Sequence, residues 1–409
     1  MPEFFNVLPP ARALEELFAR LPLAPQPRRI DTEEALDRVT AAPVLSPEPL
    51  PAFPRSTMDG YAVRARDTFG ASATLPAYLN VIGEVPMGRA PALELASGQA
   101  ALVHTGGIIP AGADAVVMIE HTQTVRANEI EVTKAAAVGE NSLRVGEDVS
   151  AGDTVIEAGA RLRPQDLGGL MALGITQVEV SRRPRFGILA TGDEVVPPQS
   201  PVAPGQIRDI NSYAVGALVQ RAGGLPIRYG IAPDDFDSLL AASSKALSEC
   251  DGLILSAGSS VSVRDLTGEV INRLGSPGVL VHGVAVKPGK PTLLAVCDGK
   301  PVFGLPGNPV SALVIAELFV KPTIERMLGL RPSPQRTVRA KLTRNIASEA
   351  GREDYVPARL VEREGELLAE PVFGKSNLIF TLIRADGLLR VPLNVNGLSA
   401  GEMVEVRLF

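Results

Sequence analysis

Apolar and polar positions alternate in two different ways along this chain, and the change between them divides it into regions. Between residues 182 and 330, short apolar runs (RFGILAT, PIRYG, GLILSA, TLLAV and PVFGL) alternate with segments whose apolar residues recur at helical spacing. Strands that alternate with helices predict an α/β domain with a mostly parallel sheet. In such sheets, ligands bind at the carboxyl ends of the strands.

Two further regions carry strand-like patterning. Residues 75–147 contain the runs YLNVIGEV, GQAALVH, DAVVMIE and EIEVT, and residues 337–409 contain TVRAKLTR, DYVPARLV, ELLAEPVF, DGLLRVP and GEMVEVRLF. Turn residues separate these runs at short intervals, which is typical of small all-β domains. We therefore expect one inserted β-rich domain and one C-terminal β domain.

Three helices are predicted outside the α/β region. Residues 11–21 place Leu14, Leu17, Phe18 and Leu21 on one face, residues 31–39 begin with a good cap, and residues 164–173 begin with proline. The predicted fold class is α/β plus β in several domains. The predicted division is an N-terminal helix packed on the α/β domain (1–21), a linking α/β domain (22–48 and 147–181), the inserted β-rich domain (49–146), the α/β domain (182–330) and the C-terminal β domain (331–409).

Composition narrows the range of functions. A net charge of −6, an aromatic content of 4% and the lack of tryptophan argue against nonspecific nucleic-acid binding. Two cysteines, Cys250 and Cys297, cannot form a disulfide framework or a four-cysteine metal site. We expect no signal peptide and no membrane span, since no stretch of about 18 apolar residues occurs. A reduced, cytoplasmic setting fits.

The stretch FGLPGNPVS, residues 303–311, joins a predicted strand to a predicted helix. Asn308 suits the cap and Pro309 the first helical position. Such turns offer backbone N–H groups to an anion, and phosphate is the obvious candidate. An ordinary strand-to-helix turn is the competing interpretation.

Three more polar segments follow or lie near predicted strands. TGDE (191–194) carries adjacent carboxylates, SAGSSVSVRD (256–265) is rich in serine, and KPGKP (287–291) carries two lysines. Each alone is typical of a solvated turn. Together, at one edge of a sheet, they predict a cleft for an anion and a divalent cation.

The motifs STMDGYA (56–62), TGG (105–107) with PAGAD (110–114), GED (146–148), TGDE, KPGKP and LPGNPVS occur in an order that resembles the molybdopterin molybdenumtransferase (molybdenum insertase) family. The E domain of gephyrin is similar. The resemblance covers almost the whole chain. It implies an elongated protomer of four domains, one of them a molybdopterin-binding-like α/β domain, which acts as a homodimer. The active cleft would lie between this α/β domain and the other subunit's β domains.

The resemblance also implies a reaction. Members insert molybdate-derived metal into adenylated molybdopterin and release AMP, with Mg²⁺, and a transient partner supplies the adenylated substrate. The catalytic residues implied are Asp59, Asp193, Glu194, Asp265, Lys287 and Lys290, of which Asp193, Glu194 and Asp265 would bind metal. The substrate-binding residues implied are Thr105, Gly106, Asp148, Thr191, Gly192, Ser256, Gly258, Pro306, Gly307, Asn308, Pro309, Ser311, Arg352 and Ser376.

The chain departs from the family pattern at several positions. These are Leu143 where arginine is usual, Ala257 and Ser262 where glycines are usual, His104 where an apolar residue is usual, and Lys375-Ser376-Asn377 in place of GSG. Two other readings stay open: a non-catalytic scaffold on the same fold, and a sugar-phosphate enzyme. The second needs a general base in the cleft, and His104, His121 and His282 lie outside the carboxylate and lysine motifs.

Overall fold

The computed structural model describes residues 7–257, 261–332, 334 and 336–409, without the side chains of 257 and 261–265. The chain forms two compact units. The larger unit contains Met1–Ala42, Ala158–Arg163 and Glu179–Phe409, and the smaller one contains Pro43–Glu157 and Pro164–Val178. The five-part domain division stays a prediction.

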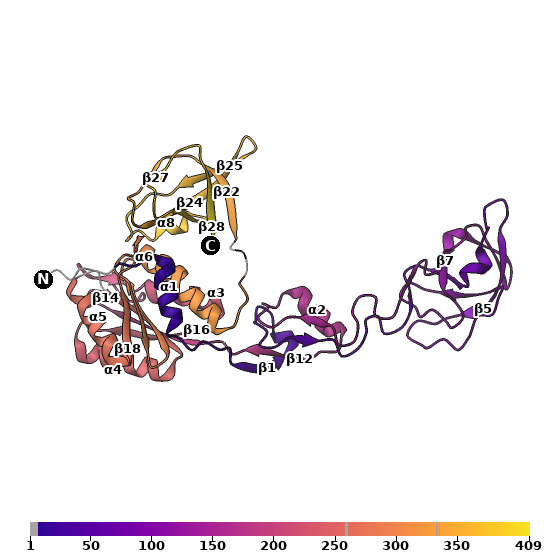
Figure 1. Ribbon diagram of the computed structural model, residues 1–409, viewed down its shortest axis with the longest axis horizontal. Coiled ribbons are helices and arrows are strands. Elements are labelled where there is room, and N and C mark those ends of the chain that lie inside the picture. Colours follow the sequence, from indigo (N-terminus) through magenta and orange to yellow (C-terminus); the bar gives the residue numbers. More distant parts are fainter. Residues whose placement is uncertain (1–6, 258–260, 333, 335) are drawn as a thin grey trace. The chain divides into compact units, whose positions relative to one another are not determined.

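The core of the larger unit is a six-stranded sheet in the order β16-β13-β17-β21-β20-β18 (Figure 1). Its four strands β16, β13, β17 and β21 pair in parallel, whereas β20 pairs antiparallel with both β21 and β18. This confirms the mostly parallel sheet. The strands are β13 (Arg185–Thr191), β16 (Leu225–Ala232), β17 (Gly252–Ala257), β18 (Pro277–His282), β20 (Leu293–Cys297) and β21 (Lys300–Pro306).

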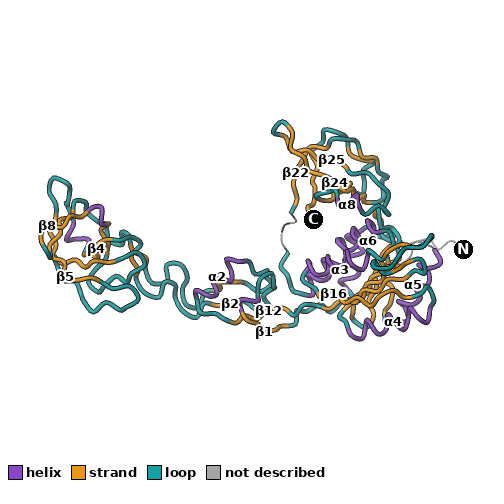
Figure 2. The backbone as a smooth tube through the Cα atoms, turned by 180° about the vertical axis from the view of Figure 1, so that it is seen from behind, coloured by secondary structure: helices purple, strands orange, loops and turns teal. Residues whose placement is uncertain are grey.

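Helices cover both faces of this sheet. One core joins the sheet to α1, α3 and α6, with Leu17, Val219, Phe303 and Ile315 fully or almost fully buried. The second core packs α4 and α5 on the other face (Figure 2). The helical elements are α1 (Pro10–Ala19), α3 (Asn211–Ala222), α4 (Phe236–Glu249), α5 (Val261–Leu274), α6 (Pro309–Ile315), the π-helical turn η4 (Ala316–Val320) and α7 (Lys321–Met327).

The C-terminal strands form a second six-stranded sheet of the larger unit, in the order β19-β24-β25-β22-β28-β26. All five predicted C-terminal strands are confirmed. The elements are β19 (Val286–Lys287), β22 (Thr337–Leu342), β24 (Glu353–Arg363), β25 (Glu366–Pro371), β26 (Gly387–Val391) and β28 (Met403–Leu408), with the short pair β23 (Ile346–Ala347) and β27 (Gly397–Leu398) and helix α8 (Phe380–Ile383).

The smaller unit contains the inserted β sheet, in the order β7-β4-β6-β5-β9-β8, and the predicted helix α2. Its buried side chains form two separate cores, one that contains Val63 and Ile130 and one that contains Val116. The elements are β2 (Val44–Leu45), β3 (Arg55–Ser56), β4 (Gly60–Val63), β5 (Ala77–Glu84), β6 (Gln99–Val103), β7 (Ala115–Met118), β8 (Thr122–Arg126), β9 (Glu129–Val132), β10 (Ser142–Leu143), β11 (Thr154–Ile156) and α2 (Pro164–Ala172).

The helix predicted over residues 31–39 is wrong. Strand β1 (Pro27–Asp31) pairs with β12 (Gln177–Ser181), and only a 3-10 turn, Thr32–Glu34, follows it. Asp37 has a φ of 61°, which a right-handed helix cannot include, and its N–H donates to the Leu162 carbonyl. Long-range backbone pairing therefore overrides the local helix signal.

Within the described part of the chain, no helix is both long enough and apolar enough to cross a membrane.

Candidate functional site

The polar segments predicted at the strand ends meet at one edge of the α/β sheet. Strands β13, β17 and β21 are neighbours and run in parallel, so Thr191 and Ser256, near the ends of β13 and β17, and Gly307, which follows β21, lie at the same edge. Asn211, the first residue of α3, links two of them: its Nδ2 donates to Ser256 Oγ at 2.9 Å and to the Gly307 carbonyl at 2.8 Å. Asn211 was not predicted as a site residue, although it begins a segment with helical spacing two residues after Asp209.

The TGDE turn directs its two carboxylates differently. Asp193 Oδ1 accepts a hydrogen bond from the Asp234 N–H at 3.2 Å, and the Thr191 hydroxyl donates to the Asp234 carboxylate. Glu194 folds back over Gly192, where a Cβ would lie 2.7 Å from Glu194 Oε2. Gly192 has a φ of 145°, which glycine adopts readily. Glycine therefore permits both this backbone conformation and the close approach of the Glu194 side chain.

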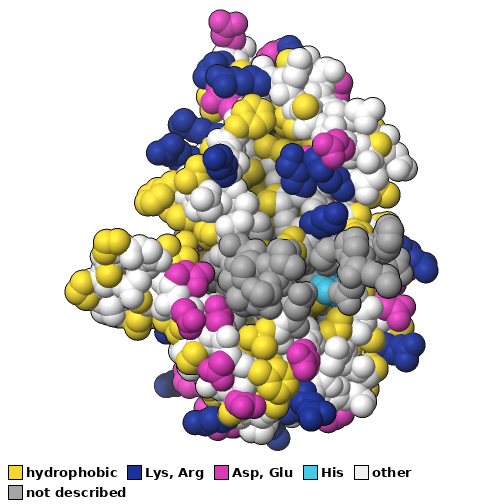
Figure 3. Space-filling model, turned by 90° about the vertical axis from the view of Figure 1, so that its left-hand side faces the viewer, with side chains coloured by type: hydrophobic (Ala, Val, Ile, Leu, Met, Phe, Trp, Pro, Cys, Tyr) yellow, Lys and Arg dark blue, Asp and Glu magenta, His cyan; other side chains and the backbone are white. Residues whose placement is uncertain are grey.

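Eight of the predicted site residues line one pocket of about 900 Å³ in the larger unit. They come from four separate stretches of the chain. The residues are Lys287, Lys290, Pro306, Gly307, Asn308, Ser311, Arg352 and Ser376. Four basic side chains and one carboxylate, Asp354, line this basic pocket, in a chain whose net charge is −6. Figure 3 shows Lys and Arg side chains gathered on the upper part of one face of the molecule.

A short strand assembles the basic side chains. The two residues of β19 pair in parallel with the start of β24, so that Lys287 lies opposite Asp354. Arg352 Nε donates to Asp354 Oδ1 at 2.9 Å, and Lys287 Nζ lies 3.9 Å from Asp354 Oδ2. The Asp354 side chain is only 5% exposed, so this buried carboxylate fixes Arg352 at the pocket wall. Gly289 packs against Ile315 of α6, because a Cβ on Gly289 would come within 2.6 Å of the Ile315 side chain.

The FGLPGNPVS turn is held by the C-terminal β region. Asn308 Nδ2 donates to Ser376 Oγ at 3.0 Å, and the Val310 N–H donates to the Ser376 carbonyl at 3.1 Å. Pro309 has no N–H, and the Ala312 N–H bonds within the helix to Asn308. This helix start therefore offers fewer N–H donors to an anion than an isolated one would, since Pro309 has none and that of Val310 is used. The basic side chains add positive charge for an anion at this pocket.

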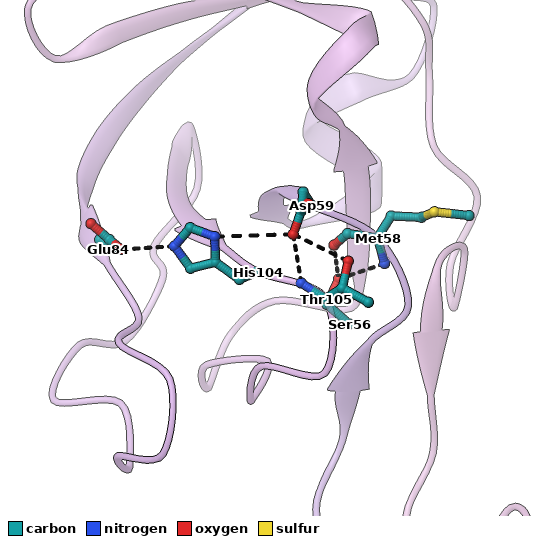
Figure 4. Close-up of polar contacts among 6 residues, drawn as sticks. All are labelled: Ser56, Met58, Asp59, Glu84, His104 and Thr105. Atoms are coloured by element: carbon teal, nitrogen blue, oxygen red, sulfur yellow. Dashed lines mark hydrogen bonds and ion pairs between the residues drawn. The ribbon is translucent and has the colours of Figure 1, made fainter.

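Asp59 lies in a separate cluster in the smaller unit (Figure 4). Its Oδ1 accepts hydrogen bonds from the Thr105 N–H at 2.8 Å and from the Thr105 hydroxyl at 3.1 Å. His104 Nε2 lies 2.7 Å from Glu84 Oε1, and its Nδ1 lies 4.0 Å from Asp59 Oδ1. Backbone pairing between Ser56 and Gly106 brings these turns together.

The Thr105 hydrogen bonds lower the pKa of the Asp59 carboxyl below its ordinary value of 3.8, the backbone N–H most strongly. Nearby His104 acts in the same direction, and slight desolvation opposes it. Asp59 is therefore an exposed carboxylate that stays ionised at neutral pH. Asp148 is also exposed, on a turn where its N–H donates to the Leu50 carbonyl.

Two predicted residues cannot be placed. Gly258 lies outside the described residues, and Asp265 lies in α5 but its side chain is outside them too. The described side chains contain no group of three histidine, cysteine, aspartate or glutamate residues that could hold a metal ion. The metal set of Asp193, Glu194 and Asp265 thus stays a prediction.

The α/β sheet with polar loops at its carboxyl edge and the two β regions can now be compared with known protein families. Three family models match: the MoeA N-terminal region (domain I and II) over residues 8–174, a probable molybdopterin binding domain over 187–326, and the MoeA C-terminal region (domain IV) over 339–409.

Individual proteins and a solved structure match this chain over almost its whole length. A putative molybdopterin biosynthesis protein of Methanocaldococcus jannaschii is 39% identical over 391 residues, covering 93% of this chain and 92% of that protein. Molybdopterin molybdenumtransferase of Bacillus subtilis is 36% identical, covering 92% and 88%. The crystal structure of a molybdopterin biosynthesis MoeA protein from Pyrococcus horikoshii, 39% identical, has a TM-score of 0.84 and covers 98% and 99%. The chain belongs to the MoeA family.

Proposed function

We propose that this protein is a molybdopterin molybdenumtransferase of molybdenum cofactor biosynthesis, which inserts molybdate-derived metal into adenylated molybdopterin and releases AMP. The observation that carries the proposal is the basic pocket, since Lys287, Lys290 and Arg352 line it together with the Ser376 hydroxyl. Molybdate and the phosphates of the pterin substrate are oxyanions, for which lysine and arginine are suitable partners.

In the proposed mechanism, the protein binds and positions the reactants. Arg352 is oriented by Asp354 and by Glu349, to which its Nη1 donates at 2.8 Å, and presents its other N–H groups to the oxyanion. Lys287 and Lys290 add positive charge. This charge would stabilise the negative charge that develops as the phosphoanhydride breaks and AMP leaves. Ser376 is held by Asn308 and offers a hydroxyl in the same wall.

Mg²⁺ fits the carboxylates of the TGDE turn. Asp193 and Glu194 follow one strand and provide hard oxygen ligands, and we assign Asp265 to the same role. Bound there, the ion would neutralise phosphate charge. Thr191, Gly192, Ser256 and Gly258 would bind the pterin substrate at this edge.

The remaining roles concern assembly. We propose a cytoplasmic homodimer in which Asp59, Thr105, Gly106 and Asp148 contribute to substrate binding in the cleft of a second copy. The adenylated substrate would come from a transient partner enzyme. Analytical ultracentrifugation tests the dimer, and a monomer at working concentration would contradict it.

The direct test is to incubate purified protein with adenylated molybdopterin, Mg²⁺ and either molybdate or tungstate, and to follow AMP release. The proposal predicts AMP only when the oxyanion and the protein are both present. Release of no AMP with either oxyanion would favour the scaffold interpretation.

A further inference from the structure

Lys375 adds a basic side chain to the basic pocket where the family pattern has glycine. It lies in the loop between β25 and α8, is exposed, and lines the pocket next to Ser376. The family resemblance assigns no role to a side chain at this position, because glycine has none.

The loop is held in place on both sides of Lys375. Ser376 is bound through its hydroxyl by Asn308 and through its carbonyl by the Val310 N–H. The Lys375 carbonyl accepts the Leu378 N–H at 3.0 Å. On the other side, Gly374 lies so close to Thr381 that a Cβ would come within 2.3 Å of Thr381 Cγ2. The backbone therefore holds Lys375 at the pocket wall.

The charges of the pocket do not cancel. Asp354, its one carboxylate, already pairs with Arg352 and faces Lys287. Lys290 and Lys375 form no ion pair with any residue that the structure describes. An anion that enters the pocket thus meets two ammonium groups whose charge is not balanced, and Lys375 is one of them.

We propose that Lys375 contacts the bound oxyanion and makes the pocket prefer tetrahedral dianions over monoanions of the same shape. The inference rests on the proposed function of this pocket and names its charge selectivity. The dianion can be molybdate or a terminal phosphate of the pterin substrate, which share this chemistry. Coulomb attraction scales with the charge of the ligand, so one added cation favours the dianion.

The test measures the affinity of the full chain for molybdate, for perrhenate and for inorganic phosphate by isothermal titration calorimetry at low salt and pH 8. Perrhenate has the shape of molybdate and half its charge. We expect Lys375→Ala to weaken molybdate binding about tenfold and perrhenate binding only about threefold, because the free-energy change halves with the charge. The difference should shrink as sodium chloride screens the lysine.

Three further variants sharpen the result. Lys375→Arg should retain the selectivity, and Lys375→Glu should weaken molybdate binding beyond Lys375→Ala. Lys245→Ala removes the same charge from an exposed position of α4 outside the pocket and should change nothing. Equal melting temperatures show that the variants are folded.

The outcomes separate the two proposals. Wild-type protein that binds neither molybdate nor phosphate would overturn the function assigned to this pocket. Wild-type protein that binds them, with Lys375→Ala indistinguishable from Lys245→Ala, would overturn this inference alone, as would equal losses for molybdate and perrhenate. A loss seen with phosphate but not with molybdate supports the inference and identifies the phosphate group as the dianion.

Discussion

The basic pocket and the Asp59 cluster hold their charged groups by different means. The pocket is built from stretches far apart in the sequence, and its charged groups are a buried carboxylate, three exposed lysines and an arginine. The Asp59 cluster joins two turns of the smaller unit, and its carboxylate is exposed and held by one threonine. A change in the pocket should therefore affect both stability and activity, whereas a change at Asp59 should affect mainly activity.

The largest effect is expected for Arg352→Ala. AMP release should fall by roughly 10²-fold, as for the loss of a positioned donor to a developing charge. The free energy of unfolding should fall by about 1–3 kcal/mol, because Asp354 loses its hydrogen-bond partner while buried. Kinetics and denaturant unfolding measure the two. Arg352→Lys is the control, with an intermediate loss of activity; normal activity in Arg352→Ala would remove this residue from the site.

Asp59→Asn should lower AMP release about tenfold, the size expected for one charge-assisted hydrogen bond. Its unfolding transition should lie close to that of wild type, because the carboxylate is exposed. Glu94→Gln removes an equal charge from another exposed position of the smaller unit and should leave activity unchanged. A clear loss of stability in Asp59→Asn would contradict the contrast drawn between the two regions.

Asn308→Ala should cost about 1 kcal/mol of unfolding free energy, since the Ser376 hydroxyl loses its donor. A double-mutant cycle with Ser376→Ala isolates this bond, and we expect a coupling energy of about 1 kcal/mol. Additive effects would show that the two side chains do not interact in solution.

The smallest effect concerns pH. The folded pKa of Asp59 is depressed, so its contribution to stability is present above the unfolded pKa and is lost as pH falls through the folded value. NMR titration should find the Asp59 midpoint below 3.8, and Thr105→Val, which removes one of the two Thr105 donors, should raise it. A midpoint that does not change in Thr105→Val would show that the hydroxyl makes no contribution.

Much of the fold follows from local pattern. The strands that end at Thr191, Ala257 and Pro306 are long and apolar, so the strands and their shared edge were predictable. Strand β19 was not, because two residues carry no periodicity and their partner, β24, lies more than sixty residues later. The same limit explains the wrong helix over 31–39, where pairing with residues 160–162 decides the structure.

The site was predictable as a set of residue types but not as an arrangement. Lys287, Lys290 and Arg352 were expected to bind anions, yet nothing local indicates that Lys287 lies opposite Asp354, far along the sequence. Asn211 links two loops through contacts that no spacing encodes. The helix start at Asn308 was expected to offer free N–H groups to an anion. The Val310 N–H instead donates to the Ser376 carbonyl, a tertiary contact that no local pattern indicates.

The hydrogen bond from Val310 to Ser376 and the pairing of β19 with β24 make the basic pocket a joint between two sheets of the larger unit. A ligand that contacts both sheets binds the folded unit and not the unfolded chain, so its binding adds to the stability of the unit. At a concentration one hundred times its dissociation constant, such a ligand contributes about 2.7 kcal/mol. The oxyanion would then act as a reversible cross-link, and a cell poor in it would hold a population more readily attacked by proteases.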